Sequence, residues 1–169
     1  MITSKKGLAK ISSTPGKTQL INHFEIVSAS EKGPSKKWYL VDLPGYGYAA
    51  TVSQKARNNW SNMIESYIRK RENLGCLFVL IDSRRDPQAI DLEFINQLGE
   101  WQVPFMIIFT KADKNKPGAT VRNVEKFMKT LSENWEEAPP HFVTSAIDRT
   151  GQKELGNCIA DLNSKFTSH

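Results

Sequence analysis

The chain has 169 residues, 39% of them hydrophobic and 24% charged, with a net charge of +5, which is typical of a soluble globular domain. Its longest apolar runs, residues 76–81 and 103–109, are far shorter than the ~20 residues that a membrane helix needs. The first residues lack the apolar core of a signal peptide, and both cysteines lie in apolar patterns where reduced residues are expected. We therefore expect a cytoplasmic protein with a single domain over residues 1–169 and no membrane partner.

The spacing of apolar residues predicts the order of the secondary structure. It begins with a loop at 1–18, a partly exposed strand at 19–27, a turn at 31–35 and a buried strand at 38–41, the two strands forming a hairpin. Helices and strands then alternate. The predicted strands are 76–81, 103–109 and 141–143. The predicted helices run from Ser53 to before Gly75, from a cap at Asp86 with Pro87 at the first position, from Thr120, and from a cap at Thr150. This alternation predicts a doubly wound α/β fold whose sheet is mostly parallel, with one antiparallel hairpin.

The apolar stripes of the predicted helices nominate core residues. They include Ile64, Ile68, Ile95, Leu98, Trp101, Val121, Val124, Phe127, Leu131, Leu155, Ile159 and Phe166.

Polar clusters follow three of the predicted strands, at Asp42–Gly45, Thr110–Asp113 and Thr144–Ala146. In a doubly wound sheet the carboxyl ends of the strands form the ligand-binding edge. A carboxylate such as Asp113 accepts two hydrogen bonds from guanine N1–H and the 2-amino group, a donor pair that adenine lacks. Each cluster alone is as well explained by a turn or a strand exit, whereas the order and intervals of all three favour a guanine site.

The order Asp-x-x-Gly, Thr-Lys-x-Asp, Thr-Ser-Ala resembles that of the translation-factor-related GTPases. The longer stretches 13–19 and 42–49, together with 81–84, resemble the EngB family of bacterial GTP-binding proteins, and the similarity covers essentially the whole chain. The resemblance implies a GTPase that binds GTP or GDP with Mg²⁺, assists assembly of the large ribosomal subunit and is linked to cell division and septation.

The resemblance also implies roles for individual residues. Thr18 and Asp42 would be the Mg²⁺ ligands, Gly45 would meet the γ-phosphate, and Lys111 and Asp113 would read guanine. The full nucleotide-binding set is Gly16, Lys17, Thr18, Gln19, Leu20, Asp42, Leu43, Pro44, Gly45, Thr110, Lys111, Ala112, Asp113, Thr144, Ser145 and Ala146. Tyr46 stands where Ras-like enzymes place the glutamine that orients water, so slow intrinsic hydrolysis is expected.

One departure from the family concerns the phosphate loop, G-x-x-x-x-G-K-[ST]. For Gly16-Lys17-Thr18 the first glycine would fall at Ile11, and Pro15 removes an amide, which also argues against a kinase or ATPase. Aligned to the family, Met1 falls near the end of the first helix, so the first strand and the phosphate loop are expected to be absent and nucleotide affinity to be weak. We expect the gap between the strands at 38–41 and 76–81 to be closed by their direct pairing, by the N-terminal segment, or by a second chain through dimerisation or strand exchange.

The positive charge is concentrated at the N-terminus. Residues 1–37 hold seven lysines against Glu25 and Glu31, whereas the rest of the chain holds 16 basic and 16 acidic residues. Such a segment fits an anionic partner as well as it fits a role in solubility alone. An alternative function is therefore a non-hydrolysing module that binds RNA or the ribosome, with rRNA rather than DNA as its partner. Arg84 and Arg85 could touch RNA or phosphate, although exposed turn residues are the more ordinary interpretation.

Overall fold

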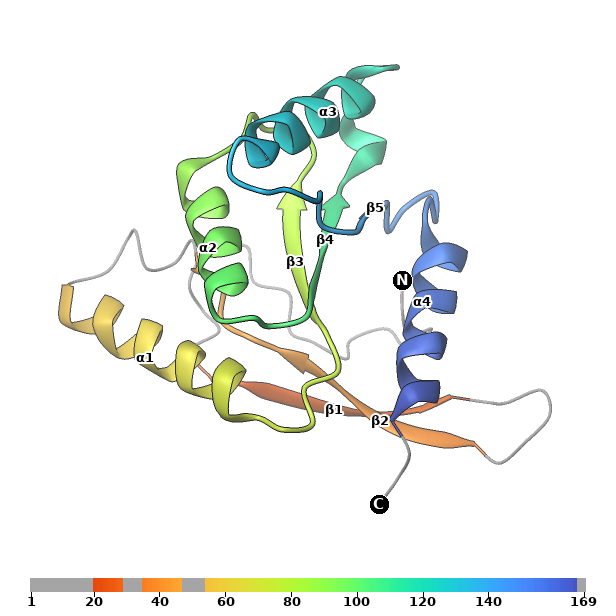
Figure 1. The fold of residues 1–169 in the computed structure, drawn as a ribbon. Helices are drawn as coiled ribbons and strands as arrows, with labels where there is room; N and C mark the ends of the chain where they lie inside the picture. The colour runs from red at the N-terminus through yellow and green to blue at the C-terminus, as the bar shows by residue number, and fades with distance from the viewer. Residues whose placement is uncertain (1–19, 29–34, 47–53, 167–169) are drawn as a thin grey trace. The chain divides into compact units, whose positions relative to one another are not determined.

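The computed structural model describes residues 20–28, 35–46 and 54–166, with only the backbone for 54–60 (Figure 1). The chain divides into two compact units, one of them Thr3–Tyr67 and the other beginning at Ile68. The two units are described separately below. The single domain expected from the sequence stays a prediction.

In the first unit, β1 (Asn22–Ser28) pairs with β2 (Lys36–Asp42) as an antiparallel hairpin. Asn22 lies opposite Asp42 and Ser28 opposite Lys36. The indole nitrogen of Trp38 donates to the Ser28 hydroxyl at 2.7 Å and joins the two strands near the end of the hairpin where the chain turns. The predicted hairpin is confirmed, although its strands start and end up to three residues from the predicted positions.

A long helix, α1 (Gln54–Lys70), follows the hairpin and runs across the boundary between the units. It buries Ile64 and Ile68, as its apolar stripe predicts. Among the described residues, no helix is long and apolar enough to cross a membrane.

The second unit is built on a parallel sheet in the order β3-β4-β5 (Figure 1). Its strands are β3 (Leu77–Asp82), β4 (Phe105–Thr110) and β5 (His141–Val143). The connecting helices are α2 (Ala89–Glu100) and α3 (Ala119–Ser132), and α4 (Gln152–Lys165) follows β5. The predicted α/β class, with a parallel sheet and one antiparallel hairpin, is confirmed.

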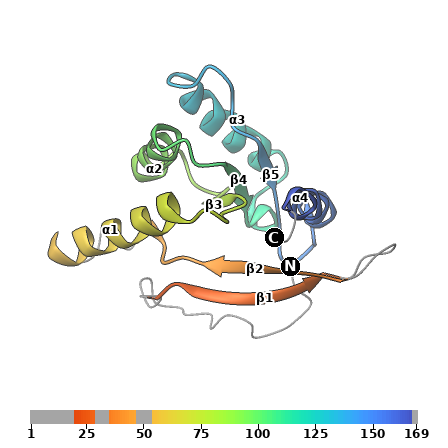
Figure 2. The same ribbon diagram turned by 60° about the horizontal axis from the view of Figure 1, so that its bottom comes forward.

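The central strand β4 sends alternate side chains to opposite faces of the sheet. On one face Phe109 packs edge-on against Phe127 of α3, with ring centroids 5.4 Å apart. On the other face Met106 meets Cys158 of α4, with the two sulfur atoms 3.4 Å apart. In Figure 2, accordingly, α4 lies across the sheet from α2 and α3. A strand apolar on both faces is typical of a buried parallel sheet.

Both cysteines are free and half-buried, in agreement with the reduced state expected for them. Burial raises the pKa of the Cys76 thiol to about 11, so this thiol stays protonated at neutral pH.

The two capping residues predicted for α2 and α4 are wrong. The residues that precede these helices are Gln88 and Gly151, neither of which makes a capping hydrogen bond with its side chain. The Asp86 carboxylate pairs instead with Lys126 at 2.6 Å, and the Thr150 hydroxyl donates to Asp148 at 2.7 Å. These two polar side chains bond to a residue of another helix and to a residue of the preceding turn, respectively, instead of to the amides at the helix ends.

Two predicted core residues are exposed. Val121 is 59% exposed because it lies in the first turn of α3, ahead of the buried positions Val124, Phe127 and Leu131. Phe166 is 47% exposed, because α4 ends before it and its backbone is extended. The other core residues of α3 and the core residues Leu155 and Ile159 of α4 are confirmed.

Direct pairing between the strands on either side of the expected gap stays a prediction, because these strands lie in different units. β2 and β3 belong to separate sheets. β3 is therefore the last strand of its sheet among the described residues, and its Leu80 is 63% exposed. Residues 1–19 lie outside the described part of the chain, and the second chain stays a prediction.

The packing of Phe127 leads to a test of this core. Replacing Phe127 by alanine empties a buried ring site against Phe109 and should lower the free energy of unfolding by about 3 kcal/mol or more in urea denaturation. Val121→Ala, on the exposed side of the same helix, should change it by less than about 0.5 kcal/mol. Equal effects of the two changes would show that α3 does not pack as described.

Candidate functional site

The carboxyl ends of the three parallel strands bring two predicted clusters together. Asp82 lies opposite Thr110 in the ladder between β3 and β4, and Phe109 lies opposite Val143 between β4 and β5. Because the strands are parallel and in register, the segments Thr110–Asp113 and Thr144–Ala146 leave the sheet at the same edge.

Backbone hydrogen bonds fix these two segments to each other. The Thr144 amide donates to the Phe109 carbonyl at 2.7 Å, and the Ala112 amide donates to the Thr144 carbonyl at 3.2 Å. The Thr110 hydroxyl donates to the Ile81 carbonyl at 3.1 Å, which ties the same exit to β3. The Thr110 hydroxyl is thus used within the sheet.

Ser145 orients Asp113. The Ser145 side chain is 1% exposed, and its hydroxyl oxygen accepts the amides of Ile147 at 3.1 Å and Asp148 at 3.3 Å. A hydroxyl has two lone pairs and one proton, so its proton remains for the Asp113 carboxylate, to which it donates at 2.7 Å. The direction of this bond is determined by the groups around it, and it holds the Asp113 carboxylate at the edge of the sheet.

Lys111 has an unusual backbone conformation. Its φ of 61° and ψ of 33° lie in the left-handed region, which costs a non-glycine residue about 1 kcal/mol or more. A short 3₁₀ turn, Ala112–Lys114, starts immediately after it. The Lys111 side chain is 54% exposed, and its ammonium lies 2.9 Å from an Asp82 carboxylate oxygen.

Asp82 is the centre of an ion triplet with Arg84 and Lys111. Arg84 donates to both Asp82 oxygens in a fork, at 2.8 and 2.6 Å, and its backbone amide donates at 3.1 Å. These bonds hold the pKa of the Asp82 carboxyl well below its usual range, and the Lys111 ammonium acts in the same direction. Asp82 in turn raises the pKa of Arg84.

The interpretation of Arg84 as an exposed turn residue is correct as far as exposure goes, but it omits the fork to Asp82. The place of Asp82 in the site was not predicted. Its signal in the sequence was an acidic residue at the carboxyl end of a third parallel strand.

The remaining candidate residues are divided between the first unit and the part of the chain that is not described. Asp42, Leu43, Pro44 and Gly45 follow β2; Asp42 is exposed, Pro44 is buried, and a Cβ at Gly45 would meet no atom within 4 Å. Leu20 is 72% exposed. Gly16, Lys17, Thr18 and Gln19 lie outside the described residues, so the roles expected for them stay predictions.

The metal site expected at Thr18 and Asp42 also stays a prediction. Within the ranges 20–28, 35–46 and 54–166, no three His, Cys, Asp or Glu residues gather in a group that could hold a metal ion. Magnesium commonly takes one or two protein oxygens and completes its shell with water and phosphate, so the hydroxyl and carboxylate expected at this site are donors of a suitable kind.

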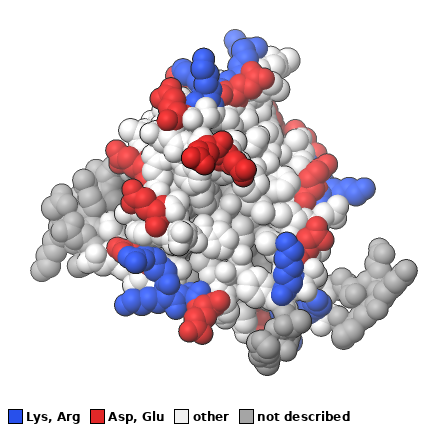
Figure 3. All heavy atoms as spheres, viewed as in Figure 1, with Lys and Arg blue, Asp and Glu red and all other residues white. Residues whose placement is uncertain are grey.

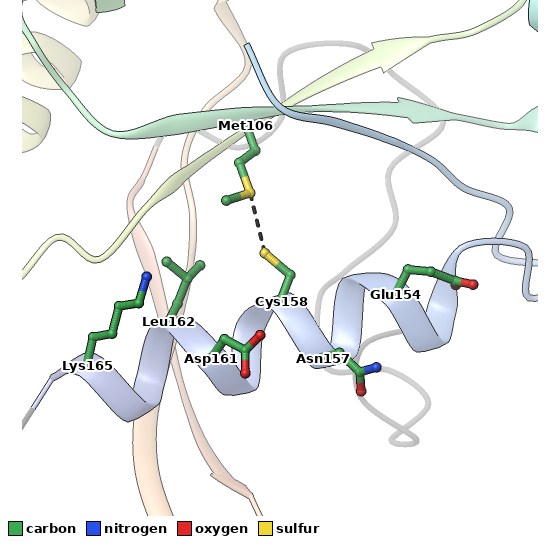
Figure 4. Close-up of a pocket in the computed structure, with 7 residues that line it drawn as sticks. All are labelled: Met106, Glu154, Asn157, Cys158, Asp161, Leu162 and Lys165. Atoms are coloured by element: carbon green, nitrogen blue, oxygen red, sulfur yellow. Dashed lines mark hydrogen bonds between the residues drawn. The ribbon is translucent and has the colours of Figure 1, made fainter.

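Hollows in the second unit lie elsewhere than the strand-end edge. One of about 450 Å³ lies beside α4 and is lined by Met106, Glu154, Asn157, Cys158, Asp161, Leu162 and Lys165 (Figure 4). Another of about 870 Å³ borders Trp135 and Gly99. Neither is lined by the two strand-end segments.

The charged side chains on the face shown in Figure 3 are mixed in sign. Over α3, at the top of the view, Lys and Arg side chains lie beside acidic ones. This mixture matches the neutral balance of residues 38–169.

Comparisons of sequence relate the whole chain to known proteins. Residues 1–111 match the family described as 50S ribosome-binding GTPases. A probable GTP-binding protein EngB of Bacteroides fragilis is 51% identical over 168 residues, which make up 99% of this chain and 79% of that protein. A protein of the same description from Flavobacterium psychrophilum is 51% identical over 164 residues, or 96% of this chain and 76% of that protein.

Solved structures share the fold. The translation elongation factor SelB of Methanococcus maripaludis, in complex with the GTP analogue GppNHp, has a TM-score of 0.60 at 17% identity, over 88% of this chain and 29% of that one. A crystal structure of a probable GTP-binding protein EngB has a TM-score of 0.57 at 19% identity, over 86% of this chain and 85% of that one.

Gly151 supports the segment that carries Ser145, and a pair of glycine substitutions tests this. At Gly151, φ is +70° and a Cβ would lie 2.2 Å from the Val143 carbonyl oxygen, so Gly151→Ala should cost about 2 kcal/mol or more. Gly156, inside α4, has open space at its Cβ position, so Gly156→Ala should stabilise the fold by about 0.5–1 kcal/mol. Urea denaturation measures both, and stabilisation by Gly151→Ala would contradict the described loop.

The ion triplet predicts a dependence on pH. A carboxyl whose pKa is lowered by folding stabilises the fold above its unfolded pKa of about 3.9, and this contribution is lost as the pH falls. The stability advantage of the wild type over Asp82→Asn should therefore shrink as the pH is lowered below about 4. Urea midpoints of both proteins across this range provide the measurement, and an advantage that does not change with pH would rule out the ionised triplet.

Proposed function

We propose a guanine site for this chain, which belongs to the EngB family of GTP-binding proteins. The site is the edge formed by Thr110–Asp113 and Thr144–Ala146. The observation that carries the proposal is the Asp113 carboxylate held by the buried hydroxyl of Ser145 at 2.7 Å. A carboxylate fixed in this way is an acceptor that selects for paired donors.

The residues of the site would divide the work of base recognition. Asp113 would accept the N1–H and 2-amino protons of guanine, and a backbone amide in Ser145-Ala146 would donate to its 6-oxo oxygen. The Lys111 stem would lie along the base, as lysine methylenes commonly cover apolar surface. Adenine offers Asp113 no such pair of donors, so the Asp113 carboxylate held by Ser145 would discriminate between the purines.

The phosphates and Mg²⁺ would be met by Thr18, Asp42 and Gly45. Thr18 and Asp42 would hold the ion and Gly45 would offer its amide to the γ-phosphate; the exposed Asp42 and the open space at Gly45 are compatible with these roles. Bound Mg²⁺ would neutralise charge on phosphate oxygens. With Tyr46 in place of the glutamine that orients water in Ras-like enzymes, we propose slow intrinsic hydrolysis.

The wider role proposed is in the cytoplasm, in assembly of the large ribosomal subunit, with a link to cell division. The description of the matching family as 50S ribosome-binding supports a ribosomal partner, and the excess of +5 over residues 1–37 suits contact with rRNA. The same lysines favour the second candidate function, a module that binds RNA or the ribosome without hydrolysing GTP.

The guanine site is tested by changing Asp113 to asparagine. The amide presents a donor where guanine N1–H needs an acceptor, so GDP should bind at least about tenfold more weakly and XDP correspondingly more tightly, since a hydrogen bond to a charged group contributes about 1.5–3 kcal/mol. Titration with fluorescent GDP and XDP analogues, with and without Mg²⁺, measures the change. Asp161→Asn, an exposed aspartate on α4, is the matched control.

Two outcomes would decide against the proposal. If Asp113→Asn leaves the preference for GDP over XDP unchanged, the base does not meet Asp113. If the wild type binds no guanine nucleotide under any condition, the RNA-binding function is favoured instead.

A further inference from the structure

Beyond the residues that would touch the nucleotide, we infer that Asp82 is a positioning residue of the base site, which holds the Lys111 side chain in place before the nucleotide arrives. The inference rests on the proposed guanine site, which it extends by a residue of β3. The ion triplet of Asp82, Arg84 and Lys111 carries it.

Asp82 is well placed to act on Lys111. Its side chain is only 16% exposed, at the end of β3, whereas the Lys111 side chain is 54% exposed. One Asp82 oxygen accepts both the Lys111 ammonium at 2.9 Å and an Arg84 nitrogen at 2.6 Å. The better-ordered partner is thus the carboxylate, and the lysine is the group being held.

The backbone at Lys111 makes this contact specific. The left-handed conformation at φ 61° is secured by the Ala112 amide bonded to Thr144 and by the Lys114 amide bonded to the Lys111 carbonyl at 3.0 Å. Strain of this kind persists where surrounding structure enforces it, and it commonly marks ligand sites. From this fixed point the Lys111 side chain reaches the end of the neighbouring strand.

Both ends of the base-reading segment are therefore held in place. Asp82 holds the ammonium of Lys111, and Ser145 holds the carboxylate of Asp113 two residues later. A free lysine side chain loses about 1.5–2 kcal/mol of rotamer entropy when it is ordered. Holding it in advance removes part of that cost from binding, which is how pre-organisation raises affinity.

Arg84 completes the arrangement. Its fork takes both Asp82 oxygens and keeps the carboxylate in one orientation and ionised. An exposed pair between Asp86 and Lys126, at 2.6 Å, provides a comparison, because neither residue belongs to the base-reading segments. Because the Asp82 side chain is only 16% exposed, the triplet can hold Lys111 in place in addition to stabilising the fold.

The test is an NMR titration of the ¹⁵N-labelled chain with guanosine and with GDP, a method that measures weak affinities. Asp82→Asn should weaken both ligands by a similar factor of about three- to tenfold, because the Lys111 stem contacts the base that they share. An effect acting only through charge on the phosphates would change GDP alone. Asp86→Asn, which breaks the comparison pair, should leave both affinities unchanged.

A double-mutant cycle shows whether Asp82 acts through Lys111. Lys111→Met keeps most of the stem but removes the ammonium, so adding Asp82→Asn to it should cause no further loss. Arg84→Gln should lower the affinity less than Asp82→Asn does, and this loss should also be absent in the Lys111→Met background. Arg84→Gln can replace Asp82→Asn in the test if the latter fails to fold.

The outcomes separate this inference from the function on which it rests. Unchanged guanosine affinity in Asp82→Asn, or a loss that persists in the Lys111→Met background, overturns the positioning role alone. If the wild type binds neither guanosine nor GDP, the guanine site itself is wrong, and the role of Asp82 is wrong with it.

Discussion

The pairing of β4 with a parallel strand on each side is the constraint on which the candidate site depends. Ile107 and Phe109 are buried on one face and Ile108 on the other, and a slip by one residue would exchange these faces and disrupt the close packing against the helices on both sides. The same register sets Asp82 opposite Thr110 and Phe109 opposite Val143. Polar groups that are far apart in sequence therefore come together because the register of the apolar strand β4 is fixed.

Beyond that strand, the loops are held in place by polar groups whose hydrogen-bonding capacity is filled. The buried Ser145 hydroxyl has two amides on its oxygen, which leaves its proton one acceptor. Asn115 likewise bonds to the Ser83 hydroxyl at 3.0 Å and to Thr120 at 2.8 Å, and so links the loop after β4 to the turn after β3 and to α3. Leaving such a group unpaired away from water costs free energy, so each group restricts where its hydrogen-bond partner can lie.

Much of this could be predicted from the sequence, because it depends on local regularities. The strands and helices of the second unit follow from apolar spacing, and the meeting of Thr110–Asp113 with Thr144–Ala146 follows from the rule that parallel strands end at one edge. The helix caps could not be predicted, since Asp86 is drawn to Lys126, a partner 40 residues away. Nor could the partners of Asp82, because the Lys111 contact depends on a positive φ that no residue type at that position signals.

The outer edge of β3 has a consequence for the behaviour of the chain in solution. Among the described residues the strand has a neighbour on one side only, and Leu80 beside that edge is largely exposed. Peptide groups on an open edge can pair with a strand from another molecule, and an apolar surface next to them adds to the attraction. A strand added to that edge, from elsewhere in the chain or from another molecule, would extend the sheet of this unit by continuing its hydrogen-bond ladder.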